Sequence, residues 1–185
     1  MPLLEIEDIS SVTLLLSIVG AVLCFIGYAV RFCLHFYQYK KGADLPPWGY
    51  RFSLIIVFLG YLGWGFWCGN DPVKMNIASS VSLPLGIALA VIGFGFFGYS
   101  EMKKGSVGAE QQLVTTGIYS KLRHPMYLGI ILFHIGMPLI FRSFAALVST
   151  VLWAAIIFSW KVFEERNLER QFGGKYVEYK RKTWF

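Results

Sequence analysis

The chain has 185 residues, of which 56% are hydrophobic, 17% are aromatic and only 15% are charged. Its mean hydropathy is +0.55. Soluble globular domains are about 45–50% apolar and about a quarter charged, so this composition excludes a water-soluble protein and indicates one integral membrane domain. Three cysteines are too few, and odd in number, for an extracellular disulfide scaffold, and their spacings exclude a zinc site.

Five apolar segments predict an all-α, polytopic membrane protein with five transmembrane helices. Because a helix rises 1.5 Å per residue and the hydrocarbon core is about 30 Å thick, one span needs about 20 residues. The last two segments are slightly short, and only Arg142 and Ser143 separate them, which predicts a hairpin. The predicted spans are residues 9–30, 52–70, 77–100, 126–141 and 144–160.

The distribution of basic residues predicts the orientation in the membrane. Fifteen of the 17 Lys and Arg residues fall on one side of these spans, and only Lys74 and Arg142 fall on the other. By the positive-inside rule, the N-terminus should lie outside and the C-terminus in the cytoplasm. Orientation and contact with anionic headgroups of membrane lipids then explain the net charge of +6, and no nucleic-acid partner is required.

Several glycines lie inside the apolar segments. Gly93, Gly95 and Gly98 spell the dinucleotide-binding string, but that string functions only at a strand-to-helix turn in a soluble βαβ unit. Close packing between membrane helices is the better interpretation, and it extends to the pair Gly65 and Gly69.

Polar residues collect in two segments, one just before the fourth predicted span and one just after the fifth. Because a hairpin returns the chain to the same membrane face, Arg123 and His124 should meet Glu164 and Glu165 at the cytosolic surface. Pro125 suits the first turn of a helix, whose free backbone N–H groups, with Arg123 beside them, bind anions. Carboxylates accept hydrogen bonds from an ammonium or a ribose diol, so the site formed by these two segments suits a zwitterionic, ribose-bearing ligand.

An alternative is that these residues form a structural ion-pair cluster that binds nothing. Lys161 and Glu165 are spaced as an i,i+4 helical pair, which fits this alternative. Beyond the fifth span, Leu168 and Phe172 keep helical spacing, so the helix should continue as a cytosolic tail until Gly173 and Gly174 cap it.

A longer ordered string carries a resemblance to a known family. From Leu113 to Gly129 the chain reads Leu-Val-x-x-Gly-Ile-Tyr-x-x-x-Arg-His-Pro-x-Tyr-x-Gly, and Glu-Glu, Phe-Gly and Tyr-x-x-Tyr follow the predicted hairpin. Over residues 110–182 this set closely resembles the isoprenylcysteine carboxyl methyltransferase family and its relatives among phospholipid methyltransferases. The resemblance implies an integral membrane enzyme that transfers a methyl group from S-adenosylmethionine to a lipid-like acceptor.

The resemblance also implies roles for individual residues. Residues 1–100 would form a three-helix membrane scaffold, and residues 101–185 the cofactor-binding catalytic region. In the eukaryotic members of the family, an arginine four residues before the site glutamate is associated with substrate, but this chain has Trp160 there, with Lys161 next to it. The candidate substrate residues are therefore Trp160, Lys161 and the intramembrane His134. The implied cofactor-binding residues are Gln111, Gln112, Leu113, Val114, Tyr119, His124, Pro125, Met126, Tyr127 and Glu164.

Methyl transfer from a sulfonium is an in-line displacement that needs no metal, so we expect no metal site. The protein must align the reacting atoms and exclude water. A carboxylate or thiolate acceptor needs no base, whereas a protonated amine must first lose a proton, for which His124 or Glu165 are candidates. With Arg123, these are the candidate catalytic residues, and O-, N- and S-methylation stay open.

Two other functions remain as alternatives. NADPH-dependent membrane reductases of the sterol or steroid type also carry an Arg-His-Pro-x-Tyr-x-Gly string. They commonly have Asn before the Tyr and an acidic residue after the Gly, where this chain has Met126 and Ile130. A non-catalytic membrane interaction protein would bind no cofactor.

Overall fold

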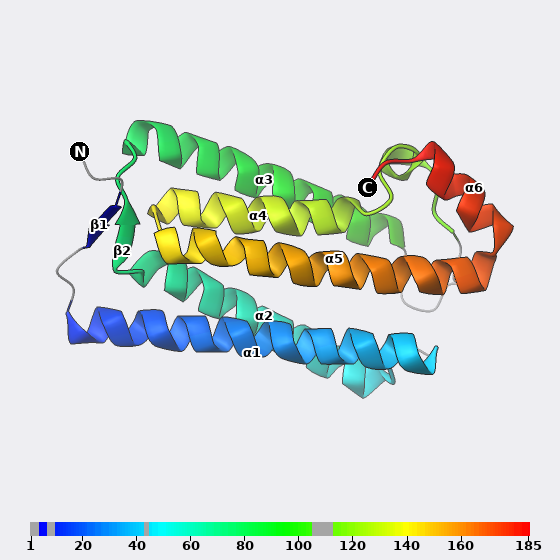
Figure 1. Cartoon of the computed structure of the whole chain (residues 1–185), viewed down its shortest axis with the longest axis horizontal. Coiled ribbons are helices and arrows are strands. Elements are labelled where there is room, and N and C mark those ends of the chain that lie inside the picture. The colour runs from blue at the N-terminus through cyan, green and yellow to red at the C-terminus, as the bar shows by residue number, and fades with distance from the viewer. Residues whose placement is uncertain (1–3, 7–9, 43–44, 105–112) are drawn as a thin grey trace.

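The computed structural model describes residues 4–6, 10–42, 45–104 and 113–185, and within them the protein is almost entirely helical (Figure 1). A short antiparallel sheet, which the sequence did not predict, pairs β1 (Leu4–Ile6) with β2 (Val73–Met75), and a 3₁₀ helix, η1, covers Gly117–Ser120. The described helices are α1 (Ser11–Lys41), α2 (Pro47–Asn70), α3 (Ser79–Lys104), α4 (Pro125–Phe141), α5 (Phe144–Phe172) and α6 (Gly174–Lys182).

The apolar helices account for the membrane character. By length and composition, α1, α2, α3 and α5 can each cross a membrane, while α4 has 17 residues and is shorter. Helix α1 continues to Lys41, well past the predicted end of the first span, because no helix-breaking residue precedes Gly42, which caps it with a positive φ of 63°. Helix α5 likewise runs to Phe172, and Gly173 ends it at the predicted position.

Glycines bring α3 and α4 into backbone contact. A Cβ atom built on Gly93 would lie 2.5 Å from the carbonyl oxygen of Gly129, and one on Gly86 would lie 2.7 Å from that of Gly136. No side chain fits at such distances, so the two antiparallel helices depend on these glycines. The predicted packing role is confirmed for Gly93 but wrong for Gly95, where a Cβ would meet nothing within 4 Å.

Helices α1 and α2 approach each other in the same way. A Cβ on Gly20 would lie 2.7 Å from the carbonyl oxygen of Gly63, and one on Gly27 would lie 2.8 Å from the Cα of Gly60. The prediction for Gly65 is wrong, because a Cβ there would meet open space. The same open space surrounds Gly98 of α3, and Gly69 has only an ordinary contact with Phe141 at 3.9 Å.

A polar cluster fixes the connection between α4 and α5. These helices are joined through Arg142 and Ser143 and run side by side in opposite directions (Figure 1). One oxygen of the buried Asp71, at the end of α2, accepts hydrogen bonds from Ser143 Oγ at 2.5 Å and from the backbone N–H of Ala145 at 2.9 Å. This contact lies at the β1–β2 end of the molecule and sends α5 back toward the opposite end, where α6 lies (Figure 1).

Candidate functional site

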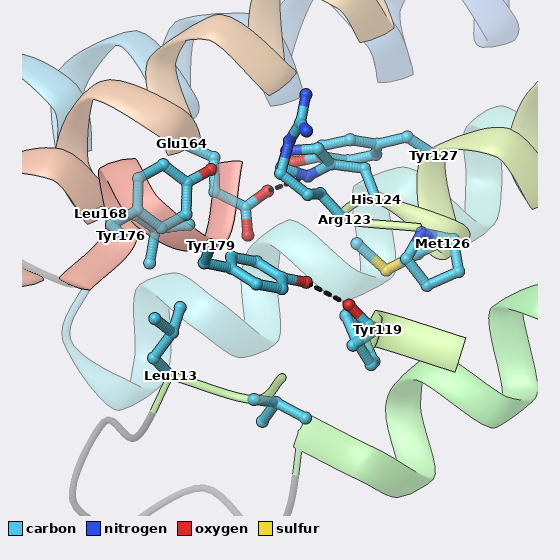
Figure 2. Close-up of a pocket in the computed structure, with 12 residues that line it drawn as sticks. Leu113, Tyr119, Arg123, His124, Met126, Tyr127, Glu164, Leu168, Tyr176 and Tyr179 are labelled. Atoms are coloured by element: carbon cyan, nitrogen blue, oxygen red, sulfur yellow. Dashed lines mark hydrogen bonds and ion pairs between the residues drawn. The ribbon is translucent and has the colours of Figure 1, made fainter. Parts of the chain in front are cut away.

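A pocket of about 120 Å³ lies where η1, the start of α4, the later part of α5 and α6 meet (Figure 2). The two polar segments that the sequence predicted to converge therefore do so. Ligand pockets usually measure about 300–1,000 Å³, so this space encloses only part of a nucleoside-sized ligand unless a wall moves. The lining residues are Leu113, Val114, Tyr119, Arg123, His124, Pro125, Met126, Tyr127, Glu164, Leu168, Tyr176 and Tyr179.

His124 lies between the two adjacent glutamates. Its Nδ1 is 3.7 Å from Glu164 Oε2, and its Nε2 is 3.2 Å from Glu165 Oε1. The imidazole also stacks on the Tyr127 ring at a centroid distance of 5.4 Å, and the Tyr127 hydroxyl hydrogen-bonds to Glu164. The Glu164 side chain keeps 31% of its surface exposed and faces the pocket, whereas Glu165 keeps 10% and does not line it.

Glu165 is instead surrounded by cations. Arg123 Nε lies 3.2 Å from Oε1, and Lys180 Nζ lies 2.8 Å from Oε2. Lys161 is also 3.9 Å from Oε1, so the predicted helical pair forms. Hydrogen bonds to Glu165 and Glu169 raise the pKa of Lys180 above its ordinary value. This part of the site therefore matches the structural ion-pair cluster considered as an alternative, and Glu165 joins α4, α5 and α6.

Arg123 holds the C-terminal strap, which we define as Thr183–Phe185. Its Nη1 donates to the carbonyl oxygens of Lys180, at 3.0 Å, and Thr183. The backbone N–H groups of Arg123 and His124 donate to the main-chain oxygens of Trp184 and Phe185 at 3.0 and 3.2 Å. The Arg123 guanidinium, one of the donors that the sequence assigned to an anionic ligand, is thus used by the protein's own strap, because the chain after α6 folds back beside residues 121–124.

Two tyrosine hydroxyls in the pocket wall indicate which kind of ligand the pocket can bind. The hydroxyls of Tyr119 and Tyr176 are buried, and neither has a hydrogen-bond partner among the described residues. Burial raises the pKa of Tyr176, so its phenol keeps its proton at neutral pH and can donate. A buried hydroxyl without a partner costs about 1–3 kcal/mol. A ligand that accepts hydrogen bonds from both hydroxyls, and donates to Glu164, fits these residues.

The structure separates the remaining predicted residues from the pocket. Trp160 is buried against α1, and Lys161 Nζ lies over the Phe185 ring, 4.6 Å from its centroid. His134 is buried in the core, where its Nε2 is 2.5 Å from the Tyr28 hydroxyl and its Nδ1 is 2.8 Å from the Ile130 carbonyl oxygen. Since that carbonyl only accepts, Nδ1 carries a proton and Nε2 accepts from Tyr28, as in a neutral imidazole.

Some predictions lie outside the described residues, and some lining residues were not predicted. Gln111 and Gln112 fall in the first group. No cluster of potential metal ligands occurs among the residues that the structure describes. Leu168, Tyr176 and Tyr179 line the pocket without having been assigned to it. The available signals were the i,i+4 spacing of Leu168 from Glu164 and the Tyr-x-x-Tyr string that Tyr176 and Tyr179 form.

These features define a helical membrane protein whose pocket, lined by both polar and apolar side chains, lies at one end of its helices, and comparison with known proteins gives the family. The profile of the phospholipid methyltransferase family matches residues 75–175, which include α3, α4, α5 and most of the pocket. The chain belongs to the phospholipid methyltransferase family.

Curated relatives confirm the resemblance to isoprenylcysteine carboxyl methyltransferases. The chain is 36% identical over 103 residues to protein-S-isoprenylcysteine O-methyltransferase of Saccharomyces cerevisiae, covering 52% of this chain and 40% of the relative. The Schizosaccharomyces pombe protein of the same name is 32% identical over 91 residues, covering 46% and 36%. Protein-S-isoprenylcysteine O-methyltransferase B of Arabidopsis thaliana is 28% identical over 130 residues, covering 67% and 61%. The matched part is thus between about a third and three fifths of each relative's length.

Proposed function

We propose that this protein is an S-adenosylmethionine-dependent methyltransferase that acts on a lipophilic acceptor at the membrane surface. The observation that carries the proposal is the pair of buried, unpartnered hydroxyls of Tyr119 and Tyr176 in the same pocket wall as Glu164. The family match supports it, because residues 75–175 include Glu164 and the turn before α4. Neither the reductase nor the interaction protein has comparable support.

Different pocket residues would bind different groups of the cofactor, which supplies an electrophilic methyl group on a sulfonium sulfur. Glu164 offers a partly exposed carboxylate to an ammonium or a ribose diol. Tyr119 and Tyr176 offer hydroxyl donors. The apolar side chains of Val114 and Met126 line the same pocket and exclude water from the reacting atoms. Arg123 and Glu165 position the walls.

The acceptor determines whether the protein must also move a proton. With a carboxylate acceptor, an oxygen–carbon bond forms as the sulfur–carbon bond breaks, and no proton is transferred. With an amine, His124 is the group within the pocket that is placed to take the proton, and the two glutamates beside it would stabilise the resulting cation. The names of the relatives favour an S-isoprenylcysteine carboxylate as acceptor, and the family description favours a phospholipid amine as the second candidate.

The proposed placement in the membrane has five spans, α1 to α5, with the N-terminus outside and the pocket and α6 at the cytosolic surface. In this placement α4 and α5 form the hairpin, residues 1–100 are the scaffold, and residues 101–185 are the catalytic region. The charge distribution supports it, since fifteen of the 17 Lys and Arg residues fall on the pocket side. A polar cofactor would enter from the cytosol and a lipid acceptor from the bilayer.

Ligand-dependent unfolding followed by product analysis tests this function. Purified protein in lipid nanodiscs is melted with S-adenosylmethionine, with NADPH and without ligand. At 100 times its dissociation constant, a ligand stabilises by about 2.7 kcal/mol, and we expect this shift with S-adenosylmethionine alone. Methyl-labelled cofactor is then incubated with S-farnesylcysteine or phosphatidylethanolamine. Alkali releases the label from a methyl ester and leaves it on a methylated amine. Stabilisation by NADPH alone would refute the proposal.

A further inference from the structure

A shallow groove of about 290 Å³ lies on the side of α5 that is turned away from the pocket. Val162 and Arg166 come two positions before and two positions after Glu164, which places them about 200° around the helix from the carboxylate in the pocket wall. The groove is therefore separate from the proposed cofactor site. Its lining residues are Phe158, Ser159, Val162, Phe163 and Arg166.

The groove changes from apolar to basic along α5. Phe158 and Val162 keep 47% and 43% of their surfaces exposed. Arg166 follows Val162 by about one helical turn, and Arg170 follows by one more. This order suits a helix that passes from the hydrocarbon core into the headgroup layer, because an arginine there keeps its charged end in the polar region. The complementary ligand is therefore amphiphilic, with an apolar chain and a polar head.

The end of α1 supplies a tyrosine that joins the two arginines into what we call the basic cluster, defined as Tyr39, Arg166 and Arg170. The Tyr39 hydroxyl accepts hydrogen bonds from Arg166 Nη1 at 3.3 Å and from Arg170 Nη2 at 3.4 Å. The Tyr39 ring stacks on Phe163 at a centroid distance of 4.9 Å, and the Arg170 guanidinium lies over it, also at 4.9 Å. A hydroxyl that accepts two hydrogen bonds still has a proton to donate, and among the described residues none accepts the proton of Tyr39.

No carboxylate balances the charge of these arginines in the part of the chain that the structure describes. Glu165 precedes Arg166, and Glu169 precedes Arg170, but both glutamates pair with Lys180 of α6, at 2.8 and 2.9 Å. The last two residues of α1 are lysines, which add positive charge at the same end of the molecule (Figure 1). Basic residues at this level attract anionic lipids, so the complementary head of the ligand is an anion at the membrane surface.

We propose that the basic cluster binds the phosphate group of an anionic phospholipid from the leaflet at the α6 end, and that an acyl chain of this lipid lies in the groove. The planar guanidinium groups of Arg166 and Arg170 match the spacing of phosphate oxygens, and the Tyr39 hydroxyl donates a further hydrogen bond. Because the groove faces away from Glu164, this lipid is not the methyl acceptor.

Such a lipid would stabilise the packing of α1 against α5. Tyr39 comes from α1 and the two arginines from α5, so one phosphate would contact both helices. Their guanidinium groups lie close to one hydroxyl, and like charges held together repel each other unless an anion lies between them. Binding the phospholipid should therefore raise the melting temperature. This inference does not depend on methyltransferase activity.

Lipid binding to the purified full chain tests the proposal. Delipidated protein in detergent is mixed with phosphatidylglycerol, with phosphatidylcholine, or with glycerophosphoglycerol, which is the first headgroup without acyl chains, and native mass spectrometry measures the bound ligand. We expect phosphatidylglycerol to bind about tenfold more tightly than phosphatidylcholine, whose choline cation offsets the phosphate charge. Glycerophosphoglycerol at the same concentration should not displace the lipid, because it has no chain to bury in the groove. Equal binding of the two lipids, or displacement by the headgroup alone, overturns the proposal.

Matched variants identify the residues responsible. Arg166→Gln combined with Arg170→Gln should reduce the affinity for phosphatidylglycerol about tenfold and abolish the rise in melting temperature. Tyr39→Phe, which leaves the net charge unchanged, should reduce the affinity about threefold. The control combines Lys175→Gln with Arg181→Gln, which removes the same charge from exposed positions of α6 and should change the affinity less than about twofold. If the double arginine variant does not fold, lysine replaces both arginines, which keeps the charge without the planar fork.

The outcomes separate a defined lipid site from general attraction to charge. An equal loss of affinity in the α6 control and in the arginine variant overturns the proposal, because it would show that only net charge matters. Wild-type affinity in both Tyr39→Phe and the folded arginine variant also overturns it. None of the residues of the basic cluster lines the pocket, so binding of S-adenosylmethionine should be the same in all these variants. Failure of the wild-type protein to bind that cofactor would contradict the methyltransferase proposal and leave the lipid site unaffected.

Discussion

At the scale of single residues, the site shows how two adjacent glutamates acquire different roles. Successive positions on a helix point about 100° apart, so Glu164 faces the pocket while Glu165 points toward Arg123 and Lys180. The sequence indicated that both belong to the site, but it could not assign their roles, because the cations around Glu165 come from α6 and the turn before α4 as well as from α5.

Neutralising each glutamate should therefore have a different effect. Glu164→Gln should weaken S-adenosylmethionine binding by about 1–3 kcal/mol and lower the melting temperature of the ligand-free protein less than Glu165→Gln does, because the amide oxygen can still accept from the Tyr127 hydroxyl. Glu165→Gln should lower that melting temperature, because partly buried cations lose their counterion. Calorimetric titration and melting curves measure the two effects. Glu178→Gln is the control, since its pair with Lys182 is exposed and contributes little. Unchanged cofactor affinity in Glu164→Gln would show that Glu164 does not bind the cofactor.

The pocket tyrosines allow a similar comparison. Tyr119→Phe and Tyr176→Phe remove buried hydroxyls that have no described partner, so the ligand-free protein should be as stable as before or more so. Both variants should bind S-adenosylmethionine more weakly. Tyr179→Phe should instead destabilise the ligand-free protein by about 1 kcal/mol, because its hydroxyl donates to the Tyr119 carbonyl oxygen at 2.7 Å. Loss of stability in the first two variants would mean that their hydroxyls serve the fold.

At the scale of helices, hydropathy predicted where the apolar segments lie. It predicted less well which helices pack against each other. The end of α2 and both ends of α4 follow from the uncharged segments and from Pro125, and Gly173 ends α5, whereas α2 begins at Pro47, five residues before the predicted span. The contacts between helices instead follow glycines seven residues apart, such as Gly86 and Gly93. The G-x-x-x-G pattern identifies Gly65 and Gly69, which are four residues apart, and misses the spacing of seven residues. Packing partners from distant segments are not encoded locally, which limits such predictions.

Substituting these glycines separates true contacts from exposed positions. Gly93→Ala should destabilise the protein, because the new Cβ would lie 2.5 Å from the Gly129 carbonyl oxygen, a backbone atom that cannot move aside without separating α3 from α4. Gly95→Ala should be neutral or stabilising by up to about 1 kcal/mol, since alanine favours the helix and the space is open. Unfolding in mild detergent measures both. Equal stability of the two variants would contradict the backbone contact.

The C-terminal strap is the element whose position the sequence did not indicate. Its contacts with residues 121–124 are backbone hydrogen bonds, which any residues can make, and the Arg123 side chain adds specificity. The pocket volume of about 120 Å³ is below the usual range for ligands, and α6 supplies the lining residues Tyr176 and Tyr179. We therefore expect α6 to shift when the proposed cofactor binds. Arg123 then acts as a positioning residue for this wall.

Releasing the strap should be visible in amide exchange. In Arg123→Gln, the side chain no longer has a guanidinium to donate to the Lys180 and Thr183 oxygens, so amides of α6 and the strap should exchange faster. Cofactor affinity should fall with them, and amides of α3 should keep their wild-type rates. Arg181→Gln, on the same element but exposed, is the matched control. Unchanged exchange in α6 together with weaker binding would indicate that Arg123 contacts the cofactor directly.

At the scale of the whole molecule, the positions of the basic residues and of the pocket together predict the orientation of the protein in the membrane. β1, β2 and the α4–α5 turn lie at one end of the helices, and α6 lies at the other (Figure 1). The basic residues concentrate toward the α6 end, so the positive-inside rule predicts that the pocket lies at the cytosolic surface. In a background with the native cysteines replaced, Lys175→Cys should react with a membrane-impermeant thiol reagent only after the membrane is opened, and Ile6→Cys, which is exposed near β2, should react in sealed cells. The two positions test each other, because a reversed molecule would exchange the two results. That reversal would place the pocket outside, away from cytosolic S-adenosylmethionine, and would contradict both the orientation and the proposed route of the cofactor.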